Sequence, residues 1–165
     1  MRWTCSRCGG EHDGLPHDWA FTEPTYWNGG RSDDDRLTED LCRWTDDDGN
    51  PSFFIRGILT IPVLDADDDV RFGVWSSLSE RSFERVIELW DDPRRVAEEP
   101  YFGWLSNSLP GYPETLNLAV DVVTRHVDVR PEFVLHQADH PLVQEQERGI
   151  TSARVREIAE LNLHV

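Results

Sequence analysis

An apolar run over residues 53–63 is the feature that most constrains the fold of this chain. Apolar side chains occupy both sets of alternating positions, which predicts a central strand covered on both sides. Pro62 marks its end. An acidic loop over residues 65–69 follows, and residues 71–78 predict a second strand. We therefore expect the two segments to pair as an antiparallel hairpin.

Helices and further strands are predicted after the hairpin. Ser79 is a candidate N-cap for an amphipathic helix. The apolar face of that helix has helical spacing and comprises Phe83, Val86, Ile87 and Trp90. Residues 116–129 and 133–137 predict two more strands, which Arg130 and Pro131 separate.

Two helices are expected near the end of the sequence. The first covers residues 141–148 and stops at Gly149, a typical C′ residue. The second starts at Thr151, where Ile150 and Val155 are spaced as a hydrophobic staple. Its predicted inward face comprises Val155, Ile158 and Ala159.

Residues 1–50 are rich in Gly, Pro and Asp, which are loop signals, and we expect only a short helix over residues 34–42. The predicted class is α+β, with a mostly antiparallel sheet, packed helices and an irregular N-terminal extension that resembles a zinc knuckle. A length of 165 residues suits one domain. We therefore divide a single domain into an irregular metal-knuckle segment over 1–50 and an α+β core over 51–165.

The most specific chemical signal is Cys5-x-x-Cys8-Gly9. This spacing puts two sulfurs on one side of a tight turn, so that both can reach one tetrahedral zinc ion. Two further ligands are needed. The candidates are His12, His17 and Cys42, and we favour His12 and Cys42.

Zinc at this turn would be structural, because a segment with so little apolar periodicity cannot order itself by burial alone. Two alternatives remain, a redox pair and an unmetallated turn. A redox Cys-x-x-Cys normally opens a helix, which lowers the thiol pKa. Gly9-Gly10 disfavours a helix start here. Cys42 alone could also be a small buried apolar residue.

The net charge of −16 excludes most nucleic-acid and anionic-membrane binding, which need basic surfaces. All cations of the chain are arginine. This acidity reflects either codon bias or adaptation to salt, and it would suit a basic protein partner. The start shows no apolar signal-peptide region, and no apolar run is long enough to span a bilayer. Together with an odd cysteine count, this predicts a cytoplasmic protein with reduced thiols.

Arg56 and His140 are the candidates for a pocket. Arg56 interrupts an apolar strand and could bind an anion, although an ion pair with a carboxylate is the simpler interpretation. His140 follows Asp139 and precedes Pro141, so a helix cap is favoured over a catalytic Asp-His pair. The sequence has no nucleophile elbow and no phosphate-binding glycine loop. We therefore favour a binding module over an enzyme.

A stretch over residues 101–113 combines aromatic residues with Gly and Pro. Such a loop can present rigid contact area to a partner, or its aromatic side chains can fill the core beneath it. The candidate recognition residues are Tyr101, Phe102, Trp104, Asn107 and Tyr112.

The order of several motifs along the chain resembles a bacterial family, the domain of unknown function 2199, over nearly the whole chain. These motifs are Cys5-x-x-Cys8-Gly9 with His12 and Leu15-Pro16, Asp40-Leu41-Cys42, Phe53-Phe54-Ile55-Arg56-Gly57, Gly73-Val74-Trp75, Phe102-Gly103-Trp104-Leu105, Leu109-Pro110-Gly111-Tyr112-Pro113 and Asp139-His140-Pro141-Leu142. The resemblance implies a small cytoplasmic bacterial protein and assigns no activity. It supports His12 and Cys42 as ligands, because both fall within its motifs.

These features rank three hypotheses. The first is a zinc-stabilised module that binds a protein, with an immunity-type protein against a basic toxin as one version. The second is an enzyme that uses Arg56, His140 and a carboxylate, or an open zinc site. The third is a redox or metal-buffering role for Cys5 and Cys8. The oligomeric state stays open.

Overall fold

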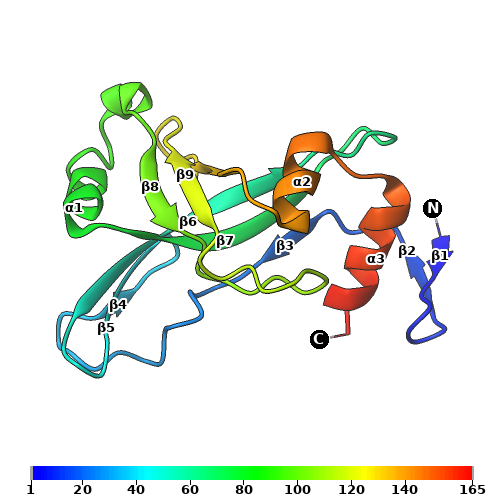
Figure 1. The fold of residues 1–165 in the computed structure, drawn as a ribbon, viewed down its shortest axis with the longest axis horizontal. Coiled ribbons are helices and arrows are strands. Elements are labelled where there is room, and N and C mark those ends of the chain that lie inside the picture. Colours follow the sequence, from blue (N-terminus) through cyan, green and yellow to red (C-terminus); the bar gives the residue numbers. More distant parts are fainter. Residues whose placement is uncertain (1, 165) are drawn as a thin grey trace.

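The computed structural model describes residues 2–164, and two long strands run through its centre. These are β6 (Pro51–Ile61) and β7 (Val70–Leu78). They pair antiparallel from Phe53 opposite Leu78 to Ile61 opposite Val70, as the sequence predicts (Figure 1). The pair is buried along most of its length, because other strands and helices cover both of its faces.

The main sheet has the strand order β3-β7-β6-β10-β9-β8. Beside β6 and β7, this order contains β3 (Asp18–Ala20), β8 (Tyr101–Trp104), β9 (Ala119–Val123) and β10 (Glu132–Leu135), and two further strands join the sheet through β6. Strand β3 joins β7 in parallel and β10 joins β6 in parallel, while the remaining pairs are antiparallel. The fold is α+β as expected, but the sheet is mixed.

The sheet curls until its last strand returns to β7. Trp104 N donates to Ser77 Oγ at 3.0 Å, and Ser106 N donates to the Trp75 carbonyl at 2.8 Å. Gly103 permits this approach, because a Cβ at that position would overlap the side chain of Ser76 and the Ser77 carbonyl. The curled sheet encloses the main core, whose largest fully buried side chains include Phe72, Phe133, Leu59, Ile61 and Leu105.

The strands after β8 are shorter than predicted. The segment 116–129 contains only Ala119–Val123 as strand, and the segment 133–137 becomes Glu132–Leu135. Asn117 and Asp128 both have φ of 66°, which turns the chain away from extended geometry on either side of β9.

Helix α1 (Glu80–Glu88) starts at the predicted cap, where the Ser79 side chain accepts from Ser82 N. Its buried face is narrower than expected, since Ile87 is 51% exposed and Trp90 lies beyond the helix end. A 3-10 helix, Pro93–Ala97, follows.

Helices α2 (Pro141–Arg148) and α3 (Ser152–Asn162) lie where the sequence predicts them. His140 caps α2, and Gly149 follows it with φ of 80°. Thr151 caps α3. The predicted inward face of α3 is buried and comprises Val155, Ile158 and Ala159.

The segment 1–50 contains more regular structure than expected. It forms the β1 (Arg2–Thr4) and β2 (Glu11–Asp13) hairpin, strand β3, and the pair β4 (Arg36–Leu37) and β5 (Leu41–Thr45). The predicted helix over 34–42 is therefore wrong. Strand β5 pairs with β6 along Leu41–Thr45, and these sheet hydrogen bonds override the weak local helix signal.

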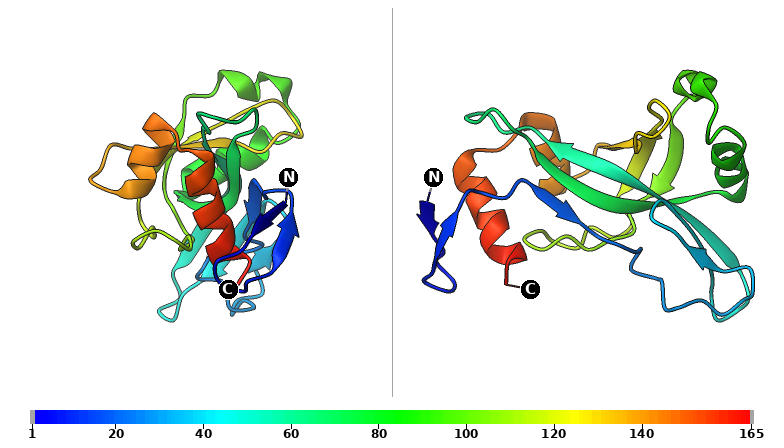
Figure 2. Two further views of the ribbon diagram at one scale, coloured as in Figure 1. Left: turned by 90° about the vertical axis from the view of Figure 1, so that its right-hand side faces the viewer. Right: turned by 180° about the vertical axis from the view of Figure 1, so that it is seen from behind.

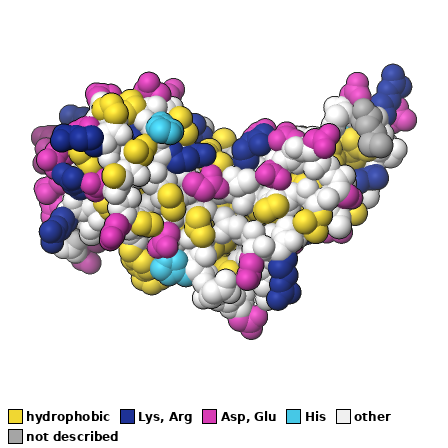
Figure 3. Space-filling view, turned by 90° about the horizontal axis from the view of Figure 1, so that it is seen from above, with side chains coloured by type: hydrophobic (Ala, Val, Ile, Leu, Met, Phe, Trp, Pro, Cys, Tyr) yellow, Lys and Arg dark blue, Asp and Glu magenta, His cyan; other side chains and the backbone are white. Residues whose placement is uncertain are grey.

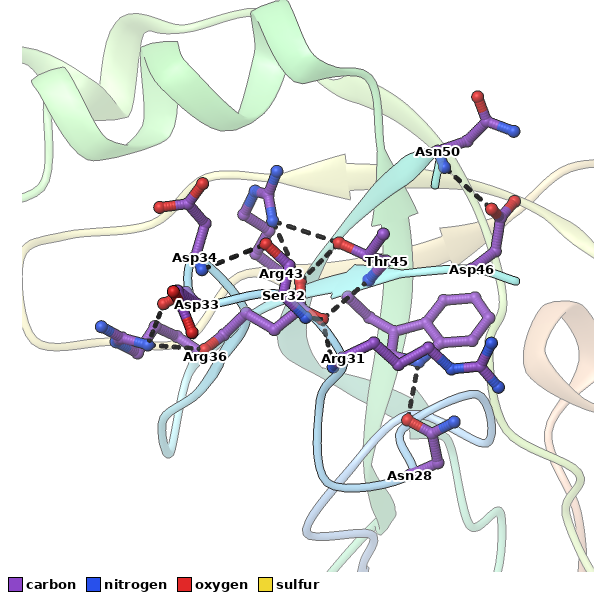
Figure 4. A network of polar contacts seen from close by, with 12 residues as sticks. Asn28, Arg31, Ser32, Asp33, Asp34, Arg36, Arg43, Thr45, Asp46 and Asn50 are labelled. Atoms are coloured by element: carbon purple, nitrogen blue, oxygen red, sulfur yellow. Dashed lines mark hydrogen bonds and ion pairs between the residues drawn. The ribbon is translucent and has the colours of Figure 1, made fainter. Parts of the chain in front are cut away.

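A buried carboxylate orders the chain just before β4. Asp35 accepts hydrogen bonds from Arg31 N at 2.8 Å, Thr45 Oγ1 at 2.7 Å and Arg43 Nη1 at 2.9 Å. Figure 4 shows Arg31, Ser32, Arg43 and Thr45 converging around this point. The network fixes the preceding loop against β5.

The molecule is elongated, and both termini lie at the same end (Figures 1 and 2). The β1–β2 hairpin and α3 form that end, whereas α1 and the β4–β5 pair lie at the other. Acidic and basic side chains are interspersed on the face in Figure 3 rather than separated by sign. No helix within residues 2–164 is both long and apolar enough to cross a membrane.

Candidate metal centre

The predicted knuckle is the tip of the β1–β2 hairpin. Trp3 pairs with His12 across the two strands, and their rings stack at 4.9 Å between centroids. Within the turn, Cys5 N donates to the Gly10 carbonyl and Gly9 N donates to the Cys5 carbonyl, both at 2.9 Å. Gly9 has φ of 69°, a conformation that favours glycine. The tight turn therefore holds both cysteines beside the second strand.

Helix α3 docks directly on this turn. Ser6 N donates to Glu160 Oε1 at 2.8 Å, and Ser6 Oγ donates to Glu160 Oε2 at 2.5 Å. Arg156 lies over the Trp3 ring, with 5.3 Å from its guanidinium carbon to the ring centroid. Ala159 is fully buried against Trp3 and Cys5, and its small side chain lets the helix approach closely.

This docking brings His164 to the cysteines. Cys5 Sγ lies 3.1 Å from His164 Nε2, and Cys8 Sγ lies 3.5 Å from His12 Nε2. All four ligand atoms lie within 4.8 Å of one another. The group of Cys5, Cys8, His12 and His164 could therefore hold one metal ion.

The surroundings of Cys5 favour the thiolate that a metal requires. Burial raises the pKa of the Cys5 thiol, but hydrogen bonds from the backbone amides of Cys8 and Arg7 outweigh burial and hold that pKa below its ordinary value. Gly10 N also lies 3.4 Å from Cys8 Sγ, which gives the second sulfur a backbone donor. Hydrogen bonds from backbone amides stabilise the negative charge of a thiolate ligand.

Cys42 does not join this group. It lies on β5, is 1% exposed, and packs with Phe54 and Trp75 in a separate hydrophobic cluster. Burial raises the pKa of its thiol to about 12, and the nearby Asp35 carboxylate adds to the effect. Cys42 is thus a protonated core residue. His17, the other candidate, is also outside the group.

Comparison with protein-family models gives one match over residues 4–150, described as an uncharacterized protein conserved in bacteria, DUF2199. The chain belongs to this family. The match confirms the resemblance and covers nearly the whole chain. Neither a search of curated proteins nor one of solved structures gave a match.

The DUF2199 match includes three members of the metal group but ends before α3 and His164. His164 could not be predicted from spacing in the sequence, because no spacing relates it to Cys5-x-x-Cys8 and Cys42 was the only other thiol available as a ligand. The signal that could have found it is the position of His164 just after an amphipathic helix whose inward face carries a small alanine.

The structure of this DUF2199 chain does not combine Arg56 and His140 into one pocket. His140 Nδ1 accepts from Leu142 N at 3.1 Å, so the ring proton resides on Nε2. That nitrogen lies 3.2 and 3.1 Å from the carbonyls of Pro113 and Glu114. Both ring nitrogens of His140 are thereby engaged in structural contacts. Arg56 instead lines a separate cavity.

The predicted recognition stretch of the DUF2199 chain divides into two sets. Asn107 is buried and bridges Trp75 N and the Glu23 carbonyl. Tyr112 and Tyr101 are half-buried, and their hydroxyls donate to Glu145 and Glu98. The side chains of these three residues are therefore engaged in contacts that stabilise the fold.

Phe102 and Trp104 form the second set. Each is 47% exposed on the outer face of β8. Their rings meet edge to face at 5.0 Å between centroids. Of the five candidate recognition residues, Phe102 and Trp104 are therefore the two that are exposed to a partner.

Proposed function

We propose that this chain is a structural-zinc module, in which one ion bound by Cys5, Cys8, His12 and His164 joins the N-terminal hairpin to the last helix. The observation that carries the proposal is the convergence of four ligand atoms within 4.8 Å. In a tetrahedral zinc site the ligand atoms lie about 3.3–3.8 Å apart. The Cys8–His12 separation of 3.5 Å falls in that range, and the Cys5–His164 separation of 3.1 Å lies just below it.

The ligand types also point to zinc in a structural role. Two thiolates with two imidazoles are a typical structural zinc set, whereas magnesium and calcium prefer oxygen ligands. Four protein ligands fill a tetrahedral site and leave no position for water or substrate. A catalytic zinc is therefore disfavoured.

The hairpin and the end of α3 need such a link. Within residues 2–164, their shared hydrophobic cluster has three buried members, Trp3, Cys5 and Ala159, with Leu15 and Trp19 partly buried against them. An ion that binds only the folded state increases the free energy of unfolding. At a free-ion concentration a thousand times the dissociation constant, that contribution is about 4 kcal/mol. For a chain of this size it corresponds to a rise in melting temperature of about 8–16 °C.

The decisive experiment is elemental mass spectrometry on protein purified without chelator. We expect about one zinc per wild-type chain, as one tetrahedral site requires. Cys8→Ser and His164→Ala should each lose most of it. Matched controls are Cys42→Ser, in the core, and His126→Ala, at an exposed histidine. Both controls should retain the ion.

Two outcomes would contradict the zinc proposal. A wild-type protein without zinc would do so, and a reversible Cys5–Cys8 disulfide in that protein would favour a redox role. Retention of zinc by His164→Ala together with its loss from Cys42→Ser would move the fourth ligand to Cys42.

We further propose that an outer aromatic platform, formed by Phe102, Trp104, Val134 and His136, binds a basic protein. Two rows of cross-strand neighbours build it. Phe102, Asp121 and Val134 lie side by side on β8, β9 and β10. Trp104 lies opposite Ala119, whose carbonyl accepts from His136 N.

The platform combines exposed apolar area with one carboxylate. Val134 is 45% exposed beside the two aromatic residues, and the Phe102 and His136 rings lie 5.5 Å apart. His136 Nε2 lies 2.7 Å from Asp121 Oδ1, which orients both side chains. Aromatic faces next to a carboxylate suit an arginine or lysine of a partner, and the net charge of −16 would steer a basic protein toward it.

Affinity purification at low salt tests this second proposal. A basic protein retained by wild type should be lost from Trp104→Ala and retained by Ile87→Ala, which removes an exposed apolar side chain elsewhere. Binding should also weaken as salt increases. Equal retention by both variants, or no retention by wild type, would contradict the platform as a binding surface.

A further inference from the structure

A cavity of about 200 Å³ lies where α1, β6 and the loop between β9 and β10 meet. Arg95, from the 3-10 helix, fixes one wall of this cavity. Its guanidinium donates to the carbonyls of Arg125, His126 and Val129, with 2.8, 2.9 and 2.9 Å between the atoms. The same side chain lies over the Trp90 ring. The loop therefore forms a fixed side of the cavity.

The cavity walls carry more positive than negative charge. Arg56, Arg95 and Arg130 face two carboxylates, Asp40 and Asp128. Three cations against two anions leave an excess of one positive charge, in a chain whose net charge is −16. Asp40 pairs with Arg130 at 2.8 Å, so its carboxylate is already engaged.

Arg56 has donor capacity that the described residues do not use. Its Nη1 donates to the Glu39 carbonyl at 3.3 Å, while its buried Nε has no hydrogen-bond partner among residues 2–164. A buried donor without a partner is costly, so it marks a place where a ligand would be stabilising. Burial lowers the pKa of Arg56, and repulsion from Arg130 adds to that effect. An anion beside the two guanidiniums would relieve both effects.

The remaining walls are apolar. Ile55, Val86 and Leu89 line one part, and the rings of Trp90 and Tyr101 line another. Such walls favour a ligand with an apolar body, because binding then removes apolar surface of both the ligand and the cavity from water. They disfavour a strongly hydrated dianion such as phosphate.

We propose that this cavity binds a small organic monocarboxylate, with its carboxylate between Arg56 and Arg130 and its apolar body against Trp90 and Tyr101. The volume is below the roughly 300–1,000 Å³ of most small-molecule sites, so it suits a compact acid. The proposal is independent of the metal centre, whose ligands lie on other elements.

The test is a ligand-observed NMR titration of the full chain with benzoate, beside uncharged benzamide and inorganic phosphate. Benzoate should bind saturably, with a dissociation constant between micromolar and about 1 mM. Arg56→Met and Arg130→Met should each weaken binding about tenfold or more, because each removes a charge-assisted hydrogen bond. Arg148→Met removes an exposed charge on α2 and should leave binding unchanged.

Circular dichroism of each variant without ligand checks that it is folded, and Arg130→Met carries the test if Arg56→Met does not fold. Equal binding by Arg56→Met and Arg148→Met would overturn the proposal. So would benzamide binding as tightly as benzoate, because the cations would then contribute nothing. Phosphate binding more tightly than benzoate would overturn it in favour of a simple anion site, and absence of saturable benzoate binding would overturn it outright.

Discussion

Cys5 and Cys42 are both buried, yet their surroundings give their thiols opposite chemistry. Backbone amides lie against Cys5 and stabilise its thiolate despite burial. Cys42 lies among aromatic rings and carboxylates, and burial with these negative charges raises its pKa to about 12. Position inside the protein therefore does not decide reactivity, whereas the groups that face the sulfur do.

This contrast predicts the order of thiol alkylation. In chelator-treated protein at pH 8, iodoacetamide should modify the exposed Cys8 and leave Cys42 unmodified, because the Cys42 thiolate is scarce far below its pKa. Added zinc should protect Cys8. Peptide mass spectrometry measures each site, and denatured protein is the control in which all three cysteines react. Rapid labelling of Cys42 in the folded protein would contradict the prediction.

Asp35 is expected to contribute stability that depends on pH. Burial alone would raise the pKa of its carboxyl, but hydrogen bonds from Arg31 N and the Thr45 hydroxyl outweigh burial and hold it well below its usual range. A carboxyl with a depressed pKa stabilises the fold above its unfolded pKa of about 3.9. That contribution declines as the pH falls below this value toward the folded pKa.

Asp35→Asn should therefore lower the free energy of unfolding by about 1–3 kcal/mol at pH 7, since the amide cannot accept from all of these donors. The difference from wild type should shrink at pH 3. Urea unfolding at both pH values measures it, with the exposed Asp48→Asn as control. If the difference in free energy of unfolding between wild type and Asp35→Asn increased on acidification, the predicted pH dependence would be wrong.

At the scale of single residues, the sequence predicts three of the four clustered metal-ligand candidates but not His164. Spacing identifies neighbours along the chain, and it brought Cys5, Cys8 and His12 together. The pairing of α3 with the hairpin depends on tertiary packing around Ala159, which no local pattern encodes. The cavity at Arg56 could not be predicted either, because its walls come from segments that are distant in sequence.

Among the elements, the return of β8 to β7 has the sharpest consequence. Gly103→Ala should destabilise the chain by about 1–3 kcal/mol, because the added Cβ would overlap backbone and side-chain atoms of β7 and push the strands apart. Gly73→Ala is the matched control, since a Cβ at Gly73 meets Ala20 at an ordinary 3.4 Å. Thermal unfolding compares the two variants. Equal melting temperatures would show that β8 does not need this approach.

The elements that sequence predicted well are those with strong local signals. The β6–β7 hairpin follows from apolar alternation, and the starts of α1 and α3 follow from their Ser79 and Thr151 caps. The helix prediction for residues 34–42 failed because β4 forms only by pairing with β5, and β5 by pairing with β4 and β6. The parallel pairing of β3 with β7 and of β10 with β6 could not be predicted either, because alternation identifies a strand but not its neighbour.

Over the whole molecule, the metal centre is expected to stabilise one end more than the middle. Chelation should increase hydrogen exchange in residues 2–20 and 152–164, while β6 and β7, buried in the main core, stay protected. Hydrogen–deuterium exchange with mass spectrometry measures this, and His164→Ala without chelator should reproduce the pattern. Uniform loss of protection across the chain would contradict a local role for the ion.

The separation of 159 positions between Cys5 and His164 has a consequence during synthesis on the ribosome. Three donors emerge early, and at about 5–20 residues per second the fourth follows on the order of ten seconds later. Until then, an ion bound by Cys5, Cys8 and His12 would have its fourth ligand position open to water. Closure of its coordination sphere would thus report that translation has passed the last helix and that this helix has folded back to the start.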